Sequence, residues 1–354
     1  MRIDQLVPAF HWGDAIGDTS RHLKEFFLSK GFHSQIYCLT RDEGLEKESV
    51  LFDFFPRPSS EDITLLHFAL PSSLTQSLAR LPSKKVVVYH NITPHPFFER
   101  FSEEMARISQ AGRQEIQSLS SKVDLALADS EYNCQELKQM GFKNTEVFPL
   151  FIDFERYKKS FSSFMLDLFS DGRTNILFVG RIVPNKKIED LIKVTFYYKK
   201  YISPMVRLII VGKVNSLPRY HQSLVRMADE FFLKPEEICF TGHVPDEEMF
   251  ALYKASHVFL SLSEHEGFGL PFVESMIFDL PILAYDCTAV PDTLGGCGVL
   301  IQEKKVDRIG ELVDRAAKDE KLRQKIIQGQ NQRVKKLKEF PREEFILNRL
   351  KELK

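Results

Sequence analysis

The sequence has few cysteines, no long apolar run and almost no net charge. The five cysteines among 354 residues are scattered without a Cys-x-x-Cys pair, which excludes a disulfide scaffold and indicates reduced thiols. No apolar run reaches the roughly 18 residues of a membrane-spanning helix, and the first residues lack the basic and apolar regions of a signal peptide. Because 48 Lys and Arg balance 49 Asp and Glu, we expect no nucleic-acid partner. We therefore expect a cytoplasmic protein of ordinary globular composition.

Several catalytic motifs are also missing. No Gly-x-Gly-x-x-Gly follows the first predicted strand, residues 3–7, and no Gly-x-x-x-x-Gly-Lys-Ser/Thr occurs in the chain. There is no His-Glu-x-x-His or Cys/His cluster for zinc, and no Gly-x-Ser-x-Gly nucleophile elbow. These absences disfavour nicotinamide dehydrogenases, P-loop enzymes, zinc enzymes and α/β-hydrolases, and we expect no metal and no cofactor.

What the sequence does contain is a series of short apolar strands that alternate with amphipathic helices, twice over. The first series predicts strands at 3–7, 35–39, 64–68, 86–89, 125–128 and 145–148, with a helix at 19–29. The second predicts strands at 176–179, 208–211, 238–240, 258–262 and 282–284, with a helix at 247–256. Near-continuous apolar strands between helices indicate parallel sheets covered on both faces. The predicted fold class is therefore α/β, with two Rossmann-like, doubly wound domains.

The domain boundaries follow from where this alternation stops. The segment 151–171 lacks a clean period and is predicted to be the linker. We assign an N-terminal domain to residues 1–155 and a C-terminal domain to residues 156–336. The tail, 337–354, has helical spacing interrupted by Pro341 and no strand after it. We therefore expect this helix to pack against the first domain.

The strongest chemical signal is the segment Ser263–Glu274, which follows a predicted strand and opens a helix. Gly267 and Gly269 permit positive φ and close approach of a ligand to the backbone, and Pro271 suits a first helical turn. The free amides and the dipole at such a helix start bind anions. Glu266 and Glu274 flank these amides, and carboxylates accept hydrogen bonds from sugar hydroxyls. The segment thus predicts a site for a diphosphate joined to a sugar or ribose.

A second signal, Phe178–Lys186, follows another predicted strand. Open α/β sheets bind ligands at the carboxyl ends of their strands. Arg181 and Lys186 would place two positive charges there, which can stabilise a departing phosphate without a metal.

Together, Glu266-x7-Glu274 and the upstream Gly180-Arg181…Lys186 resemble the retaining nucleotide-sugar glycosyltransferases of family 4, which have the GT-B fold. The resemblance extends to residues 208–212, 240–245 and 89–94. It implies two domains facing a cleft and transfer of a hexose from a nucleotide donor, such as a UDP or GDP sugar, to a glycan or lipid-linked acceptor. Bacterial polysaccharide biosynthesis is the common setting.

The resemblance also implies roles for individual positions. Glu266 would orient the donor sugar, Arg181 and Lys186 would bind the diphosphate, and His90 would lie beside the reacting carbon through its side chain or its backbone carbonyl. Gly17, in a predicted loop of residues 14–18 after the first strand, would approach the donor phosphates. The other donor-binding positions would be Gly180, Val244, Gly267, Phe268, Gly269, Leu270 and Glu274. The sequence departs from the family at Gly17-Asp18, where a paired glycine is common, and at Lys186-Lys187, where Lys-Gly is usual.

Each of these residues also has a purely structural interpretation. Acidic residues are favoured at helix starts, and Arg181 and Lys186 could be surface charges. A histidine after an apolar strand, such as His90, is more often a satisfied core residue. Ser130 could line an acceptor cleft or cap a helix.

Other functions also stay open. A glycoside hydrolase could use Glu266 and Glu274 as its carboxylate pair, although it would need no diphosphate site. A GT-B sugar phosphorylase, a nucleotide-sugar epimerase and a non-catalytic nucleotide-sugar-binding module are nearer alternatives. The basic cluster of Arg333, Lys335, Lys336 and Lys338 is expected to be a solvated helix face, with peripheral membrane contact as the alternative.

Overall fold

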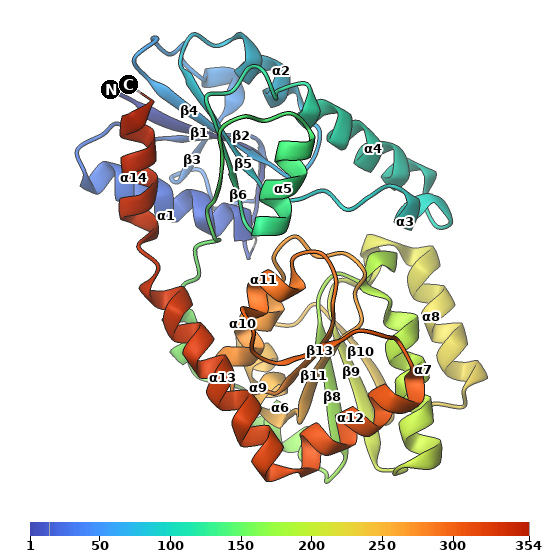
Figure 1. Cartoon of the computed structure of the whole chain (residues 1–354). Coiled ribbons are helices and arrows are strands. Elements are labelled where there is room, and N and C mark those ends of the chain that lie inside the picture. Colours follow the sequence, from blue (N-terminus) through green and yellow to red (C-terminus); the bar gives the residue numbers. More distant parts are fainter. Residues whose placement is uncertain (14, 354) are drawn as a thin grey trace. The chain divides into compact units, whose positions relative to one another are not determined.

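The computed structural model describes residues 1–13 and 15–353, which form two compact units (Figure 1). Unit 1 comprises Met1–Glu99, Glu103–Ile152 and the chain from Phe340 onward, and unit 2 comprises Arg100–Ser102 and Asp153–Glu339. Each unit is built on one sheet whose strand pairings are all parallel. The predicted α/β fold class with two Rossmann-like sheets is confirmed.

The sheet of unit 1 has the strand order β3-β2-β1-β4-β5-β6-β7. Its strands are β1 (Ile3–Phe10), β2 (Ile36–Arg41), β3 (Ser49–Leu51), β4 (Ile63–Phe68), β5 (Lys84–Tyr89), β6 (Leu125–Ala128) and β7 (Thr145–Val147). The helices are α1 (Ala15–Ser29), α2 (Ser73–Arg80), α3 (Pro96–Glu99), α4 (Glu103–Gln117), α5 (Glu131–Gln139) and α14 (Arg342–Glu352), with a 3₁₀ turn η1 (Phe52–Phe54). The order reverses between β1 and β4, which is the topological switch point of this sheet.

The sheet of unit 2 has the order β10-β9-β8-β11-β12-β13, with its switch point between β8 and β11. Its strands are β8 (Thr174–Val179), β9 (Val206–Val211), β10 (Ile238–Gly242), β11 (Val258–Ser261), β12 (Ile282–Tyr285) and β13 (Val299–Ile301). The helices are α6 (Ser163–Leu168), α7 (Ile188–Tyr201), α8 (Pro218–Glu230), α9 (Asp246–Ala255), α10 (Leu270–Ile277), α11 (Val290–Leu294), α12 (Val306–Lys318) and α13 (Glu320–Glu339). The 3₁₀ turns are η2 (Arg156–Lys158), η3 (Pro184–Lys186) and η4 (Val214–Ser216).

The C-terminal helix belongs to the core of unit 1. Helix α13 ends before Pro341, and α14 then lies beside α1 (Figure 1). Ile346 and Leu350 of α14 are buried in one cluster with Ile3, Phe26 and Phe27. Burial of two large aliphatic side chains stabilises this arrangement by about 3–6 kcal/mol.

The structure corrects several expectations about elements. Strands β3 and β13 were not predicted, because each is a three-residue edge strand too short to show a period. The predicted linker 151–171 contains η2 and α6, and the Ser162 amide donates to the Glu247 carbonyl at 2.9 Å, so most of it belongs to unit 2. Helix α1 begins at Ala15, so Gly17 lies inside a helix and not in a loop. Residue 14 of that predicted loop and residue 354 of the predicted tail lie outside the described residues.

Candidate functional site

The switch point of unit 2 brings the two strongest sequence signals together. Strand β8 pairs with β11, so the loops that follow them meet at one edge of the sheet. Lys186 and Glu266, one from each loop, form an ion pair with 2.6 Å between Nζ and Oε2. Their side chains are only 17% and 9% exposed. The carboxylate expected to bind sugar and the ammonium expected to bind phosphate are therefore direct neighbours.

Arg181 supplies the second cation of this edge. It lies two residues after β8, and its side chain is exposed. Among the described residues, no hydrogen bond or ion pair engages its guanidinium. An exposed guanidinium with five donors can bind an incoming phosphate without first breaking an internal ion pair.

Two residues that we did not predict hold the loops in place. The Asn185 side-chain amide donates to the His265 carbonyl at 2.9 Å, and the Asn185 backbone carbonyl accepts from the Glu264 amide at 2.8 Å. The Thr288 hydroxyl accepts from the Glu266 amide at 2.8 Å and donates to the Glu266 carbonyl at 3.0 Å. Glu266 is thus fixed by the loop that follows β12 as well as by Lys186.

Thr288 also has an unusual backbone conformation. Its φ of 44° lies in the left-handed region, which β-branched residues rarely adopt. Strain of this kind costs about 1–3 kcal/mol and is concentrated at functional sites. The strained residue is also the one that contacts Glu266, so the loop after β12 borders the Lys186–Glu266 pair.

The start of α10 is a tight turn that requires glycine at position 269. Gly269 precedes the helix with φ 83°, and a Cβ there would lie 2.6 Å from the Phe272 ring, so only glycine fits. Phe268 is buried beneath this turn, and the Thr293 hydroxyl donates to its carbonyl. Leu270 is the first helical residue. Gly267 does not adopt the positive φ that we expected, so its backbone conformation does not require a glycine.

Glycines at the ends of β8 and β9 let the two strand ends pack closely. The Gly180 amide continues the strand pairing by donating to the Val211 carbonyl at 2.9 Å. A Cβ on Gly212 would lie 1.9 Å from the Gly180 carbonyl oxygen, so this position excludes every other residue. Val244, expected near the nucleotide base, follows β10 at the same edge and packs its side chain on the core of unit 2.

Glu274 lies in the interior of unit 2. Its two carboxylate oxygens accept hydrogen bonds from the hydroxyls of Tyr157 at 3.1 Å and Tyr253 at 2.7 Å. Burial raises its pKa, although both tyrosine hydroxyls act in the opposite direction. The tyrosines take one acceptor position on each oxygen and leave another on each. The predicted ribose contact would have to use those remaining positions.

In unit 1, His90 belongs to a buried chain of polar side chains. Its Nδ1 lies 3.0 Å from Asp129 Oδ2, and its Nε2 lies 3.0 Å from His67 Nδ1. His67 Nε2 lies 2.9 Å from Gln5 Oε1, and the Gln5 amide nitrogen donates to the Ser20 carbonyl. Both ring nitrogens of His90 are thus engaged inside unit 1.

The direction of these hydrogen bonds assigns the protons. Because the Gln5 nitrogen donates to a carbonyl, its oxygen must accept from His67 Nε2. Burial and the neighbouring His90 hold the pKa of His67 well below its usual range, so His67 is neutral and its Nδ1 accepts from His90 Nε2. The other His90 nitrogen, Nδ1, faces the Asp129 carboxylate. His90 therefore has no ring nitrogen free to accept a proton, and only its backbone remains for the predicted contact.

Two other predicted residues of unit 1 have structural roles. Gly17 is buried in the first turns of α1, where a Cβ would lie 3.0 Å from the His11 carbonyl oxygen. The Ser130 hydroxyl accepts from the Asn133 amide at 3.2 Å, which makes Ser130 the N-cap of α5. The hydrogen bonding of Ser130 therefore supports the helix-cap interpretation.

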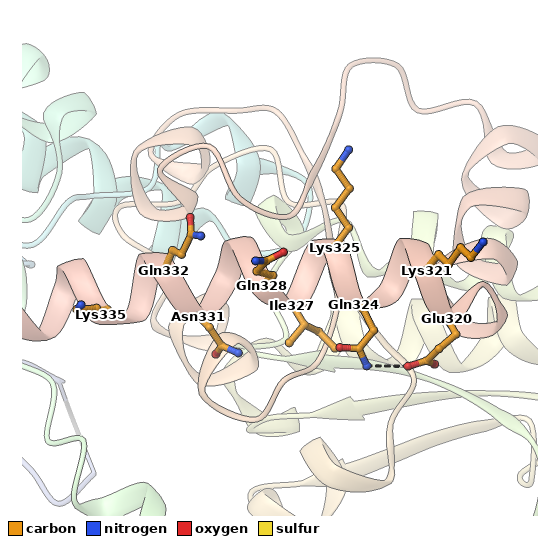
Figure 2. A pocket seen from close by; sticks show the side chains of 9 residues that line it. All are labelled: Glu320, Lys321, Gln324, Lys325, Ile327, Gln328, Asn331, Gln332 and Lys335. Atoms are coloured by element: carbon orange, nitrogen blue, oxygen red, sulfur yellow. Dashed lines mark hydrogen bonds between the residues drawn. The ribbon is translucent and has the colours of Figure 1, made fainter.

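An open hollow along α13 is separate from this edge of the sheet (Figure 2). All its lining residues, from Glu320 to Lys335, come from this one helix, so no chemistry converges there from different elements. The basic residues predicted to lie together on this helix have different environments. Arg333 donates to the carbonyls of Thr293 and Asp292, whereas Lys335 is exposed. A membrane contact through this tail stays a prediction.

Residues 1–13 and 15–353 contain neither a metal-binding cluster nor a helix that could cross a membrane. The histidine, cysteine and acidic side chains form no group of three that could hold a metal ion. None of the helices is both long and apolar enough to cross a membrane.

Comparison with solved structures defines the class of fold. Anabaena HepE in complex with UDP and glucose superposes with a TM-score of 0.73 over 99% of this chain and 100% of that chain, at 17% identity. WaaG, a glycosyltransferase involved in lipopolysaccharide biosynthesis, superposes with a TM-score of 0.69 over 94% and 95% of the two chains, at 12% identity. The two parallel sheets of this chain form the GT-B fold.

A family model matches part of the sequence. Residues 167–333 match the model of glycosyl transferases group 1. The matched segment lies in unit 2, the unit that carries Lys186 and Glu266.

Individual relatives match over part of the chain. The Escherichia coli serotype-specific mannosyltransferase WbdA is 29% identical over 145 residues, 41% of this chain and 18% of WbdA. The Escherichia coli O-antigen chain mannosyltransferase B is 26% identical over 148 residues, 42% of this chain and 38% of the relative. The Salmonella typhimurium O-antigen chain mannosyltransferase RfbU is 32% identical over 119 residues, 33% and 31% of the two chains. The matched segment thus spans well under half the length of these relatives.

Proposed function

We propose that this protein transfers a hexose from a nucleotide diphosphate sugar to a hydroxyl of a glycan or lipid-linked acceptor, with retention of anomeric configuration. The observation that carries the proposal is the Lys186–Glu266 pair at the switch point of unit 2, next to the exposed Arg181 and the start of α10. Cations and helix amides suit a diphosphate, and a fixed carboxylate suits sugar hydroxyls. A glycosidase would have no use for the anion site.

Each residue has a distinct role in this mechanism. The Lys186 ammonium has three donors, so it can bond to Glu266 and still donate to a phosphate oxygen. Arg181 and the amides that precede α10 stabilise the charge that builds on the leaving diphosphate. Glu266 orients the sugar, and Asn185 and Thr288 keep its backbone rigid. These groups supply the charge stabilisation without a metal, so excess EDTA should leave turnover unchanged.

The names of the relatives suggest the first donors to test. Three of them are mannosyltransferases of bacterial O-antigen or serotype polysaccharide, and HepE has been crystallised with UDP-glucose. Mannose and glucose donors are therefore the first candidates, in the setting of surface polysaccharide synthesis.

The test is a thermal-shift screen with UDP, GDP, ADP and their sugar conjugates. A ligand at 100 times its dissociation constant adds about 2.7 kcal/mol of apparent stability. We expect one nucleotide to stabilise the wild type and Lys193→Ala, a matched cation substitution on α7, but not Arg181→Ala. Transfer to acceptors is then followed by nucleotide release and by NMR of the anomeric proton. A requirement for inorganic phosphate would point to a phosphorylase, and no shift with any nucleotide would overturn the proposal.

A further inference from the structure

The switch point of unit 1 carries a different feature, the single tryptophan of the chain. Trp12 lies two residues after β1, at the carboxyl edge where β1 and β4 diverge in the strand order. Ligands of open α/β sheets bind at such a point. An aromatic side chain there would normally be covered, yet Trp12 is 57% exposed.

The indole is exposed but held in place. Its Nε1 donates to the Glu43 carbonyl at 3.2 Å, and the Trp12 amide donates to Asp42 at 2.9 Å. The Arg21 guanidinium lies 5.0 Å from the ring centroid and is itself fixed by Asp18 and Glu48. One face of the ring is thus covered by a cation, and the exposed area belongs to the rest of the indole. A large aromatic surface fixed in this way binds a flat ligand face at little entropic cost.

The surroundings of the ring select the chemistry of the ligand. His11 and Asp42 are paired at 2.8 Å and are both more than 40% exposed, which places polar acceptors and donors beside the indole. The charges around the ring are largely paired, Asp18 and Glu48 with Arg21 and Asp42 with His11, so the region offers no excess of positive charge to nucleic acid or another polyanion. A neutral molecule with one apolar face and a rim of hydroxyls fits best. A pyranose ring has this form, because its C–H groups stack on an aromatic face while its hydroxyls bond to carboxylates.

We propose that Trp12 is a stacking platform for a pyranose of the acceptor glycan. This inference rests on the proposed function, because it makes unit 1 the acceptor-binding unit. Strand β1 is separated from β5 by β4 alone, so the ends of β1 and β5 lie roughly 10 Å apart at about 4.8 Å per strand. That span is close to two sugar rings. Trp12 would therefore bind a sugar next to the one that reacts near His90, and acceptors of two or more sugars would bind better than a monosaccharide.

The test uses the emission of the sole tryptophan, which reports on this position alone. The wild type is titrated with methyl α-mannopyranoside, with α-linked mannobioses and mannotriose, and with maltotriose. We expect an oligosaccharide to shift the emission to shorter wavelength and to saturate, with little effect of the monosaccharide. Calorimetric titration should then show binding weakened at least about tenfold in Trp12→Ala and about two- to threefold in Trp12→Phe. Phe164→Ala, which removes another exposed aromatic ring, should leave the affinity unchanged.

Nucleotide binding separates the two proposals. If a nucleotide stabilises the protein but no oligosaccharide changes the emission, or if Trp12→Ala binds oligosaccharides as tightly as wild type, the platform is overturned and the proposed function stands. If no nucleotide binds, the proposed function fails. A change in tryptophan emission could then not be assigned to an acceptor, so the platform fails with it. Unfolding curves of both Trp12 variants confirm that the exposed substitution has left the fold intact.

Discussion

The two sheets have the same strand order around their switch points, but the residues placed there have opposite character. In unit 2 the edge carries Arg181, the Lys186–Glu266 ion pair and the start of α10. In unit 1 it carries an exposed indole and an imidazole whose ring nitrogens are both engaged by internal partners. One edge suits an anion, and the other suits a neutral polyol.

Under the two proposals, one topology would serve two substrates. The fold determines where loops converge, whereas the residues in those loops determine the charge of the ligand. The buried polar groups of the two units also differ in what they hold in place. In unit 2 they hold loop backbone, as Asn185 and Thr288 do, whereas in unit 1 they hold a side chain, His90.

The largest effect is expected for Lys186→Ala, which breaks the charged character of the unit 2 edge. Transfer efficiency, kcat/KM, should fall about 10²- to 10³-fold, because a cation facing the leaving diphosphate is lost. The free energy of unfolding should also fall by about 1–3 kcal/mol, since the mostly buried Glu266 loses its partner. Steady-state kinetics and urea unfolding measure both. Lys186→Arg should recover most of the stability, and a loss of activity below about tenfold in Lys186→Ala would contradict the assignment.

A smaller effect is expected for Asp129→Asn, which alters the polar chain of unit 1. The free energy of unfolding should fall by about 1–3 kcal/mol and transfer by about tenfold, because the His90 imidazole loses its carboxylate partner. Nucleotide binding by unit 2 should not change. ¹⁵N NMR of the histidines should show the His67 proton on Nε2 and a proton on Nε2 of His90.

Asp124→Asn is the matched control for this change, because Asp124 accepts from the Lys85 amide at the opposite end of β6 and an asparagine oxygen can do the same. A His67 proton on Nδ1 instead of Nε2 would refute the proton assignment.

The sequence predicted unit 2 better than unit 1 because its signals are local. Glu266, Gly269 and Glu274 lie within one turn and helix, so their spacing could be read directly. The chain from Gln5 through His67 to Asp129 depends on which strands are neighbours, and no local period reveals that. A signal was present nonetheless, because Gln5 and His67 are polar residues inside apolar strands and are fully buried. Buried polar groups require partners.

The remaining errors have the same physical origin. Asn185 was part of a predicted motif, but its bond to the His265 carbonyl spans 80 positions of sequence. Thr288 lies in a loop of ordinary composition, and its strained backbone appears only in three dimensions. The spacing predicted that Glu274 lies one turn inside α10. It could not predict which way the side chain points, nor its hydrogen bonds to Tyr157 and Tyr253.

A still smaller effect, a pH-dependent change in the free energy of unfolding, is expected for Glu274→Gln. Burial raises the pKa of Glu274 in the folded protein, so ionising it disfavours folding. Its contribution to stability is therefore full below the unfolded pKa of about 4.3 and is lost as the pH rises through the raised value. Glu274→Gln should be at least as stable as wild type at pH 7 to 8, and the difference should vanish as the pH falls toward 4.5.

Urea unfolding across this pH range tests the sign, and Glu237→Gln is the control with the opposite sign. Burial acts to raise the pKa of Glu237, but bonds from the Lys199 side chain and the Lys234 amide outweigh it and the pKa is lowered. Stability should therefore fall at neutral pH in Glu237→Gln. A few-fold loss of nucleotide affinity in Glu274→Gln, without loss of stability, would support the ribose contact.

The smallest effect is expected for Lys187→Gly, which restores the glycine usual in the resembling family. Lys187 adopts φ 51°, a conformation that costs a non-glycine residue about 1–2 kcal/mol. Glycine removes this strain but loses about 0.5–1 kcal/mol in backbone entropy and up to about 1 kcal/mol from the partly exposed pair with Glu264. The free energy of unfolding should thus change by less than about 1 kcal/mol, and nucleotide affinity should not change. A marked loss of affinity would instead make the Lys187 ammonium a third cation of the donor site and sharpen the contrast between the two units.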